Sequence, residues 1–219
     1  MPGLKAAILP VTPFQQNCAL LWDEDAKRAT VVDPGGDVDR ILAAVAQLGV
    51  TVERILLTHG HTDHAGGAAE LKERLGGAVE IAGPAEQDRF LLDALPEQGA
   101  RFGLDCRAVT PDRWLAEGDR VTIAGIAFDV YHCPGHTPGH VVFVAPREGV
   151  AVVGDVLFRG SIGRTDFPYG DHAALVRSIR GKLFPLGDHI AFLCGHGPGS
   201  TFGAERRTNP FVGDAAASG

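Results

Sequence analysis

The chain has 219 residues, of which 45% are hydrophobic and 21% are charged, so its composition excludes a disordered chain and a coiled coil. Its net charge of −7 argues against a general nucleic-acid-binding protein, because such proteins usually carry a basic surface. The sequence shows neither an apolar run near the ~18 residues of a membrane span nor a basic segment leading into an apolar signal, so we expect a cytoplasmic protein without a membrane partner.

The first half of the sequence alternates between predicted strands and helices. Short apolar runs predict strands at residues 5–9, 17–22, 28–33, 52–58 and 79–83. Apolar residues at helical spacing predict helices at residues 38–49, 68–77 and 84–95. Gly49 is expected to end the first helix, and Pro84 fits the first turn of the third.

The second half is richer in strands. Residues 120–132 alternate in polarity like a hairpin that turns at Gly125. Further strands are predicted at residues 140–145, 149–155 and 189–195, with a helix at residues 171–184 before the last of them. This order predicts a layered α/β fold in which helices cover sheets.

Neither a repeat nor a linker interrupts the sequence, so we expect one domain over residues 1–219, with a tail that frays from about residue 211. The cysteines stand far apart and form no CxxC pair, and a chain of this length builds a core without disulfides. We therefore expect reduced thiols at Cys18, Cys106, Cys133 and Cys194.

Histidine or aspartate follows four of the predicted strands. These residues are His59, His61, Asp63 and His64 after the first such strand, and His136, Asp155 and His196 after three later ones. Loops that follow the C-terminal ends of strands can direct polar side chains to a common point. At that position the side chains are not buried without hydrogen-bond partners. Imidazole and carboxylate suit zinc, iron or manganese. Five histidines and two aspartates are more ligands than one tetrahedral ion can bind. They suit two ions that share a bridging carboxylate.

A structural zinc site is the main alternative use of some of these residues. Its four ligands would be Cys133, His136, Cys194 and His196. That site leaves His59, His61, Asp63, His64 and Asp155 unexplained, so the open two-ion site is favoured. Asp63 also fits a helix N-cap, which does not exclude ligation, and His140 is expected to be structural because it flanks a strand.

The motifs that hold these residues resemble those of the metallo-β-lactamase superfamily. They are HGHTDH at residues 59–64, PGHTPGH at 134–140, GD at 154–155 and GHGP at 195–198. Within that superfamily, the threonine before HGHTDH, the segment GRTDFP and the short chain resemble compact bacterial glyoxalase II-like hydrolases. The chain departs from longer glyoxalase II enzymes, because only one helix and a tail are expected where those carry a helical extension that holds glutathione.

The resemblance implies an αββα sandwich, in which two mixed sheets are covered by helices and the metal ions lie at one edge. It assigns His59, His61 and His136 to one ion, Asp63, His64 and His196 to the other, and Asp155 to both. Two divalent ions are therefore expected, with zinc favoured over iron or manganese.

On this basis we expect a metal-dependent hydrolase that cleaves a small-molecule thioester such as S-lactoylglutathione. A hydroxide that bridges the ions would attack the thioester carbonyl. Asp63 and Asp155 are the expected catalytic residues, because they would hold the second ion and orient the hydroxide. A thiolate leaves readily, so no strong general acid is required. The oligomeric state stays open.

Three residues are predicted to contact the substrate. Arg164 follows a glycine-rich segment and fits the pocket mouth, or else it pairs with Asp166. Asn17 precedes a strand, where it would polarise a carbonyl or close a turn. Phe158 would line the pocket or pack in the core.

A persulfide dioxygenase is the alternative function, since that family is similar in fold and in the GRTDF segment. Such an enzyme uses one iron held by two histidines and an aspartate. Metal analysis with oxygen uptake separates the two functions. A β-lactamase is disfavoured because no signal peptide is expected.

Overall fold

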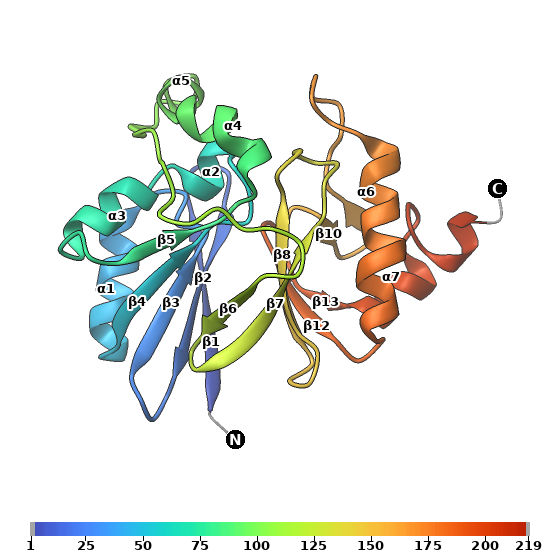
Figure 1. Ribbon diagram of the computed structural model, residues 1–219, viewed down its shortest axis with the longest axis horizontal. Helices are drawn as coiled ribbons and strands as arrows, with labels where there is room; N and C mark the ends of the chain where they lie inside the picture. Colours follow the sequence, from blue (N-terminus) through green and yellow to red (C-terminus); the bar gives the residue numbers. More distant parts are fainter. Residues whose placement is uncertain (1–2, 218–219) are drawn as a thin grey trace.

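Two β-sheets lie face to face between two layers of helices in the computed structural model, which describes residues 3–217 (Figure 1). This arrangement confirms the predicted αββα sandwich of two mixed sheets covered by helices. Among the described residues, none of the helices combines the length and apolar character needed to cross a membrane.

The first sheet has five strands in the order β1-β2-β3-β4-β5. Their bounds are β1 (Leu4–Val11), β2 (Gln16–Asp23), β3 (Arg28–Val32), β4 (Thr51–Leu56) and β5 (Glu80–Ala82). The first three strands are antiparallel neighbours, whereas β3, β4 and β5 are parallel. Parallel neighbours need a crossover, and helices provide it here.

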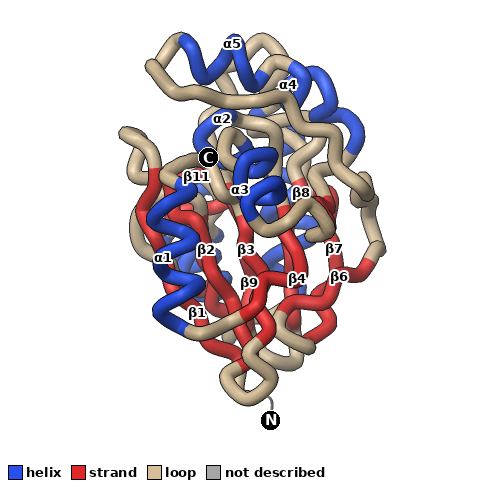
Figure 2. The backbone as a smooth tube through the Cα atoms, turned by 90° about the vertical axis from the view of Figure 1, so that its left-hand side faces the viewer, coloured by secondary structure: helices blue, strands red, loops and turns tan. Residues whose placement is uncertain are grey.

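Those crossover helices cover the outer face of the first sheet. They are α1 (Val38–Leu48) between β3 and β4, and α2 (Thr62–Ala65) and α3 (Ala68–Arg74) between β4 and β5. Figure 2 shows α1 and α3 in front of the strands. As predicted, α1 ends at Gly49, which adopts the left-handed conformation with φ of 62° and donates its N–H back to the last turn.

The second sheet has six strands in the order β13-β12-β9-β8-β7-β6. Their bounds are β6 (Arg120–Ile123), β7 (Ile126–His132), β8 (Val141–Ala145), β9 (Val150–Gly154), β12 (Ala191–Cys194) and β13 (Ser200–Thr201). Only β9 and β12 run parallel, and the other neighbours are antiparallel. A separate hairpin joins β10 (Leu157–Phe158) to β11 (Ser161–Ile162). The outer face carries α6 (His172–Ser178) and α7 (Phe202–Thr208) (Figure 1).

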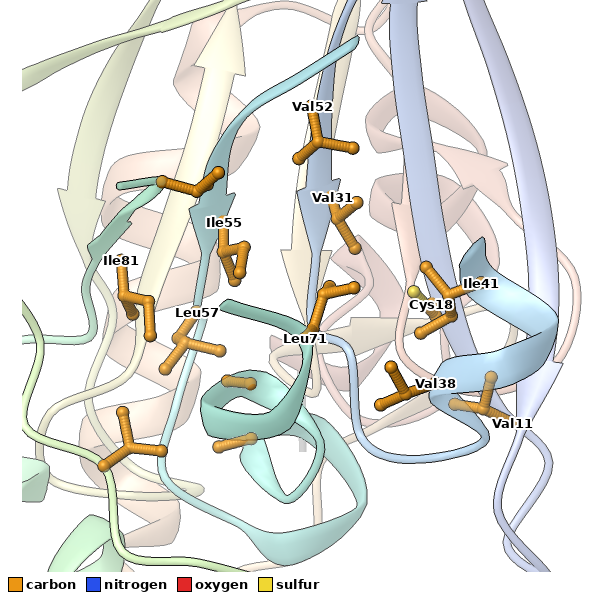
Figure 3. Packing of buried hydrophobic residues seen from close by; sticks show 14 of the residues in the cluster. Val11, Cys18, Val31, Val38, Ile41, Val52, Ile55, Leu57, Leu71 and Ile81 are labelled. Atoms are coloured by element: carbon orange, nitrogen blue, oxygen red, sulfur yellow. The ribbon is translucent and has the colours of Figure 1, made fainter. Parts of the chain in front are cut away.

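Three apolar clusters fill the spaces between the four layers. The first packs α1 and α3 on the first sheet, the second lies between the sheets, and the third packs the second sheet on α6 and α7. Side chains of the first cluster, such as Ile55 and Leu71, are drawn in Figure 3. Alternate strand residues point to opposite faces, so Phe143 of β8 enters the second cluster and Val144 enters the third.

Two predicted helices are interrupted in the structure. In place of one helix over residues 84–95, the chain forms the 3-10 helix η1 (Glu86–Asp88), then α4 (Arg89–Asp93) and α5 (Leu95–Ala100). The break lies at Ala94, whose backbone leaves the helical region, and Pro96 follows in the first turn of α5, where its missing N–H is tolerated. The helix predicted at 171–184 is α-helical only to Ser178 and continues as the π-helix η2 (Ile179–Leu183) and the 3-10 helix η3 (Phe184–Leu186).

The segment that follows Pro210, where fraying is expected, makes contacts with the rest of the fold. Val212 is buried, and the Arg180 side chain donates hydrogen bonds to the carbonyl oxygens of Val212 at 3.0 Å and Gly213 at 2.9 Å. A short 3-10 helix, η4 (Asp214–Ala217), follows. The tail is therefore attached to the second sheet's helical layer, while residues 218–219 lie outside the described residues.

The cluster between the sheets should dominate stability. Phe128 in β7 is fully buried there, so Phe128→Ala should lower the free energy of unfolding by about 3–5 kcal/mol through lost burial and an unfilled cavity. Phe211 is 48% exposed, and Phe211→Ala should change stability by less than about 0.5 kcal/mol. Urea denaturation of both variants measures the difference, and equal midpoints would contradict this description of the core.

Candidate metal centre

Strand direction brings the predicted ligands to one edge of the sandwich. β7, β9 and β12 run in the same direction, because β7 and β9 are each antiparallel to β8 and β12 is parallel to β9. His136, Asp155 and His196 follow the C-terminal ends of these three strands. The first sheet adds residues 59–64, which follow β4 and enter α2. All seven predicted ligand residues therefore lie together, as their positions after strands suggested.

One group consists of three histidines whose ring nitrogens converge. His61 Nδ1 lies 3.1 Å from His59 Nε2 and 3.0 Å from His136 Nε2. Two ligand nitrogens on one tetrahedral ion would lie about 3.3 Å apart, given metal–nitrogen bonds of ~2.0–2.1 Å. Burial lowers the pKa of His59 and His136, and it lowers that of His61 to about 3. The three rings are therefore neutral at pH 7, which is the form that binds metals.

A second group consists of Asp63, His64 and His196, whose ligand atoms lie within 4.8 Å of one another. His196 Nε2 is 3.2 Å from Asp63 Oδ2, and His64 Nε2 is 3.8 Å from the same oxygen. Asp63 lies inside α2, and His61 is the N-cap of that helix without a side-chain capping bond. The Asp63 carboxylate is thus turned toward the histidines and does not cap the helix.

Asp155 faces both groups. Its Oδ1 is 3.3 Å from His64 Nε2, and its Oδ2 is 3.6 Å from both His136 Nε2 and His196 Nε2. Burial alone would raise the pKa of Asp155, but His64 and the other imidazoles outweigh that effect and hold the pKa well below its usual range. A carboxylate in this position is suited to bridge two cations.

The donor atoms fit metal ions. His64 Nε2 and Asp155 Oδ1 are buried, and neither has a hydrogen-bond partner among the described residues. Unpaired buried polar atoms cost free energy, so their convergence at one point indicates a place for a cation. Gly195 supports this fit, because a methyl group there would overlap both Asp155 Oδ1 and the His64 ring. Among the described residues, the candidate metal-binding groups contain histidine and aspartate but no cysteine, so they offer no support for a structural site with Cys133 and Cys194.

A surrounding set of hydrogen bonds orients the histidines. Asp33 accepts bonds from Thr58 N and Thr58 Oγ1, both at 2.7 Å, and from His64 Nδ1 at 2.9 Å. The Thr58 hydroxyl in turn lies 3.0 Å from His59 Nδ1, and His136 Nδ1 donates to Arg164 O at 2.8 Å. His59, His64 and His136 each make their bond through Nδ1, which leaves Nε2 of each ring directed toward the centre.

His140 also has the structural role that we predicted. Its Nε2 accepts a hydrogen bond from Asp155 N at 3.0 Å, and its ring stacks on His59 with centroids 4.6 Å apart. Burial lowers the pKa of His140 well below its usual value, so the ring stays neutral and can accept this bond. His140 therefore fixes the loop that presents the Asp155 carboxylate.

An open cavity of about 880 Å³ lies over the centre. His61, Asp63, His136, Asp155 and His196 form part of its wall. Aromatic side chains form much of the rest, and these are Phe14, Phe90, Phe102, Phe158, Phe167 and Tyr169. Arg101 and Arg164 supply the positive charges in the lining. The cavity suits a substrate with apolar parts and an anionic group.

Two of the three predicted substrate contacts line the cavity, and the third does not belong to its described lining. Phe158 and Arg164 line the cavity, although Arg164 also forms a two-bond ion pair with Asp166 and lies over the Phe167 ring. Asn17 does not belong to the described cavity lining, and its amide donates to Cys194 O at 3.0 Å and Gly197 O at 2.8 Å. These bonds hold the His196 loop, so Asn17 is placed to act on the centre indirectly.

Sequence reasoning missed two residues close to the predicted ligands. Asp33 ends a predicted strand directly before PGG, so the strand-end rule that found Asp155 would have found it too. Tyr169 places its hydroxyl 2.9 Å from His61 Nε2 and stacks on Phe167. It comes from an irregular loop with no periodic pattern, and the sequence carries no signal for that contact.

Comparisons with known proteins agree with this geometry. A family model described as the metallo-beta-lactamase superfamily matches residues 11–196. Hydroxyacylglutathione hydrolase GloC of Haemophilus influenzae is 51% identical over 94% of this chain and 96% of its own. The crystal structure of BLEG-1 B3 metallo-beta-lactamase has a TM-score of 0.86 at 35% identity, covering 95% of this chain and 99% of that one. TTHA1623, solved in a di-iron-bound form, has a TM-score of 0.83 at 36% identity, covering 94% and 99%.

Gly195 gives a direct test of the centre. Gly195→Ala should lower the metal content of the purified protein, because the added methyl group enters the space between Asp155 and His64. Gly181→Ala is the matched control, since its methyl group would enter open space. Plasma emission spectrometry measures the metal, and circular dichroism checks that both variants are folded. A Gly195→Ala protein with the metal content of the parent would contradict the site described above.

Proposed function

The chain belongs to the metallo-beta-lactamase superfamily, and from this premise we propose that it is a metal-dependent hydrolase of small-molecule thioesters such as S-lactoylglutathione. The observation that carries the proposal is the pair of ligand groups joined by Asp155 in the wall of an open cavity. The relative named hydroxyacylglutathione hydrolase supports the substrate class, because its similarity extends over nearly the whole of both chains.

The proposed cofactor is a pair of divalent ions, with zinc favoured and iron or manganese as alternatives. His59, His61 and His136 would hold one ion, Asp63, His64 and His196 the other, and Asp155 both. When bound, such ions lower the pKa of a coordinated water toward neutrality and polarise a carbonyl oxygen. The di-iron form of TTHA1623 supports a two-ion centre in this fold.

The catalytic work of the protein is positioning. The Asp63 and Asp155 carboxylates accept hydrogen bonds and so hold an attacking water toward the substrate carbonyl. The departing thiolate is stable at neutral pH, so the reaction needs no acidic side chain opposite the centre. Phe158 packs against the substrate, and the Arg164 guanidinium, anchored by Asp166, presents its remaining N–H groups to an anionic part of it.

We also propose that the enzyme works as one domain in the cytoplasm. All four cysteines are free and buried, which supports the reducing setting expected from the sequence. The net charge of −7 supports a small-molecule partner and not a nucleic acid.

A parallel assay tests the reaction. The purified, metal-analysed protein should hydrolyse S-lactoylglutathione, measured by loss of thioester absorbance, without consuming oxygen. With glutathione persulfide it should show no oxygen uptake beyond the background of a heat-inactivated sample. Oxygen-dependent persulfide oxidation without thioester hydrolysis would replace the proposal with the dioxygenase, and turnover of a β-lactam alone would replace it with a lactamase.

Separate substitutions in the two ligand groups test the two-ion centre. His61→Ala and His196→Ala should each retain one bound ion, because each removes a ligand of a different group, whereas Asp155→Ala should weaken both. Hydrolysis should fall by at least about 100-fold in all three, since both ions contribute to the same step. Full activity in a variant that has lost an ion would refute the scheme.

A further inference from the structure

One buried carboxylate outside the proposed ligand set contacts both loops that carry the three-histidine group. Asp88 is the last residue of η1 and is fully buried. Its Oδ2 accepts hydrogen bonds from Gly60 N at 3.0 Å and Thr137 Oγ1 at 2.7 Å, and its Oδ1 accepts one from Gly139 N at 2.6 Å. All three donors belong to ligand-bearing loops and none is itself a proposed ligand.

These contacts fix the two loops relative to each other. Gly60 lies between His59 and His61, and Thr137 directly follows His136. One carboxylate therefore sets the distance between two histidines that follow β4 in the first sheet and one histidine that follows β7 in the second. The second ligand group has its own carboxylate, Asp33, which bonds His64 and Thr58.

Close backbone packing supports the same role. A methyl group on Gly60 would lie 2.6 Å from Leu91 Cβ, and one on Gly139 would lie 2.6 Å from Ala85 O and Asp88 N. The Ala85 N–H also donates to Gly139 O at 2.9 Å. The segment around η1 is thus seated on both ligand loops, and the two glycines are what allow this approach.

We propose that Asp88 is a positioning residue for the three-histidine half of the metal centre, whose hydrogen bonds to Gly60, Thr137 and Gly139 hold His59, His61 and His136 at binding distance. This inference rests on the proposed two-ion centre. A carboxylate suits the position because three donors point at it and a neutral side chain cannot accept from all of them. Burial raises the pKa of Asp88 to about 6, against the effect of these bonds, so the group is ionised at neutral pH.

Asp88→Asn tests the proposal. The amide nitrogen cannot accept a hydrogen bond, so at least one of the three donors loses its partner. The variant should keep the ion held by Asp63, His64 and His196 and bind the other about 10- to 100-fold more weakly, the usual effect of losing an outer hydrogen bond at a metal site. Titration of the metal-free protein with Zn²⁺, and the visible spectrum of the Co²⁺ form, report the two sites separately from activity.

Glu205→Gln is the matched control. Glu205 is also a buried carboxylate with three hydrogen bonds, from Gly160 N, Ser200 Oγ and Asn209 Nδ2, but these donors lie outside the ligand loops. Its loss should lower the melting temperature while both Zn²⁺ affinities stay at the parent values. If Asp88→Asn does not fold, Thr137→Val removes a single bond to the same carboxylate and should weaken the same ion.

The outcomes separate this inference from the proposed function. Two ions in the parent, with one selectively weakened in Asp88→Asn or Thr137→Val, support the inference. Two ions bound with parental affinity and an unchanged Co²⁺ spectrum in the folded variants overturn it and leave the two-ion centre standing. A parent protein that binds fewer than two ions overturns the two-ion centre itself, and the inference falls with it.

Discussion

Convergence of buried imidazole nitrogens and carboxylate oxygens at one edge of the sandwich is the constraint around which the chain is arranged. Lone pairs directed at a common point repel one another, and away from water they need a cation to make their burial favourable. That requirement explains neighbouring features that otherwise have no reason to coincide. Gly195 leaves room at the centre, Asp33 turns His64 inward, and His140 holds the loop of Asp155.

Local sequence patterns were sufficient for the layers and for the proposed ligands. Short apolar runs marked most of the strands, alternation marked the hairpin at residues 120–132, apolar residues at helical spacing marked the helices, and the ligand motif follows β4. The patterns failed where tertiary packing decides the outcome. The helix predicted at residues 84–95 is broken at Ala94 and the chain resumes as α5 up to Ala100, and Arg180 contacts Val212 from a distant segment. Asn17 shows the same limit, because its partners lie about 180 residues away along the chain.

The relatives share this chain's fold but carry different functional names, since one is called a hydroxyacylglutathione hydrolase and another a B3 metallo-beta-lactamase. Specificity in such a family belongs to the loops around the centre more than to the centre itself. In this chain those loops contribute an aromatic wall, in which Phe14 and Phe102 meet edge to face at 4.8 Å and Tyr169 stacks on Phe167. Four of the six aromatic residues in the described cavity lining thus come from segments without regular secondary structure.

The proposed ligands come from both sheets, and this origin has a consequence for the amount of folded protein in a cell. An ion held by His59 and His61 from one sheet and His136 from the other is a cross-link between two halves of the fold. Any ion that binds only the folded chain adds about 1.4 kcal/mol of stability for each tenfold excess over its dissociation constant. Metal scarcity would therefore lower the amount of folded protein as well as its turnover, so the abundance of the enzyme would follow the metal supply.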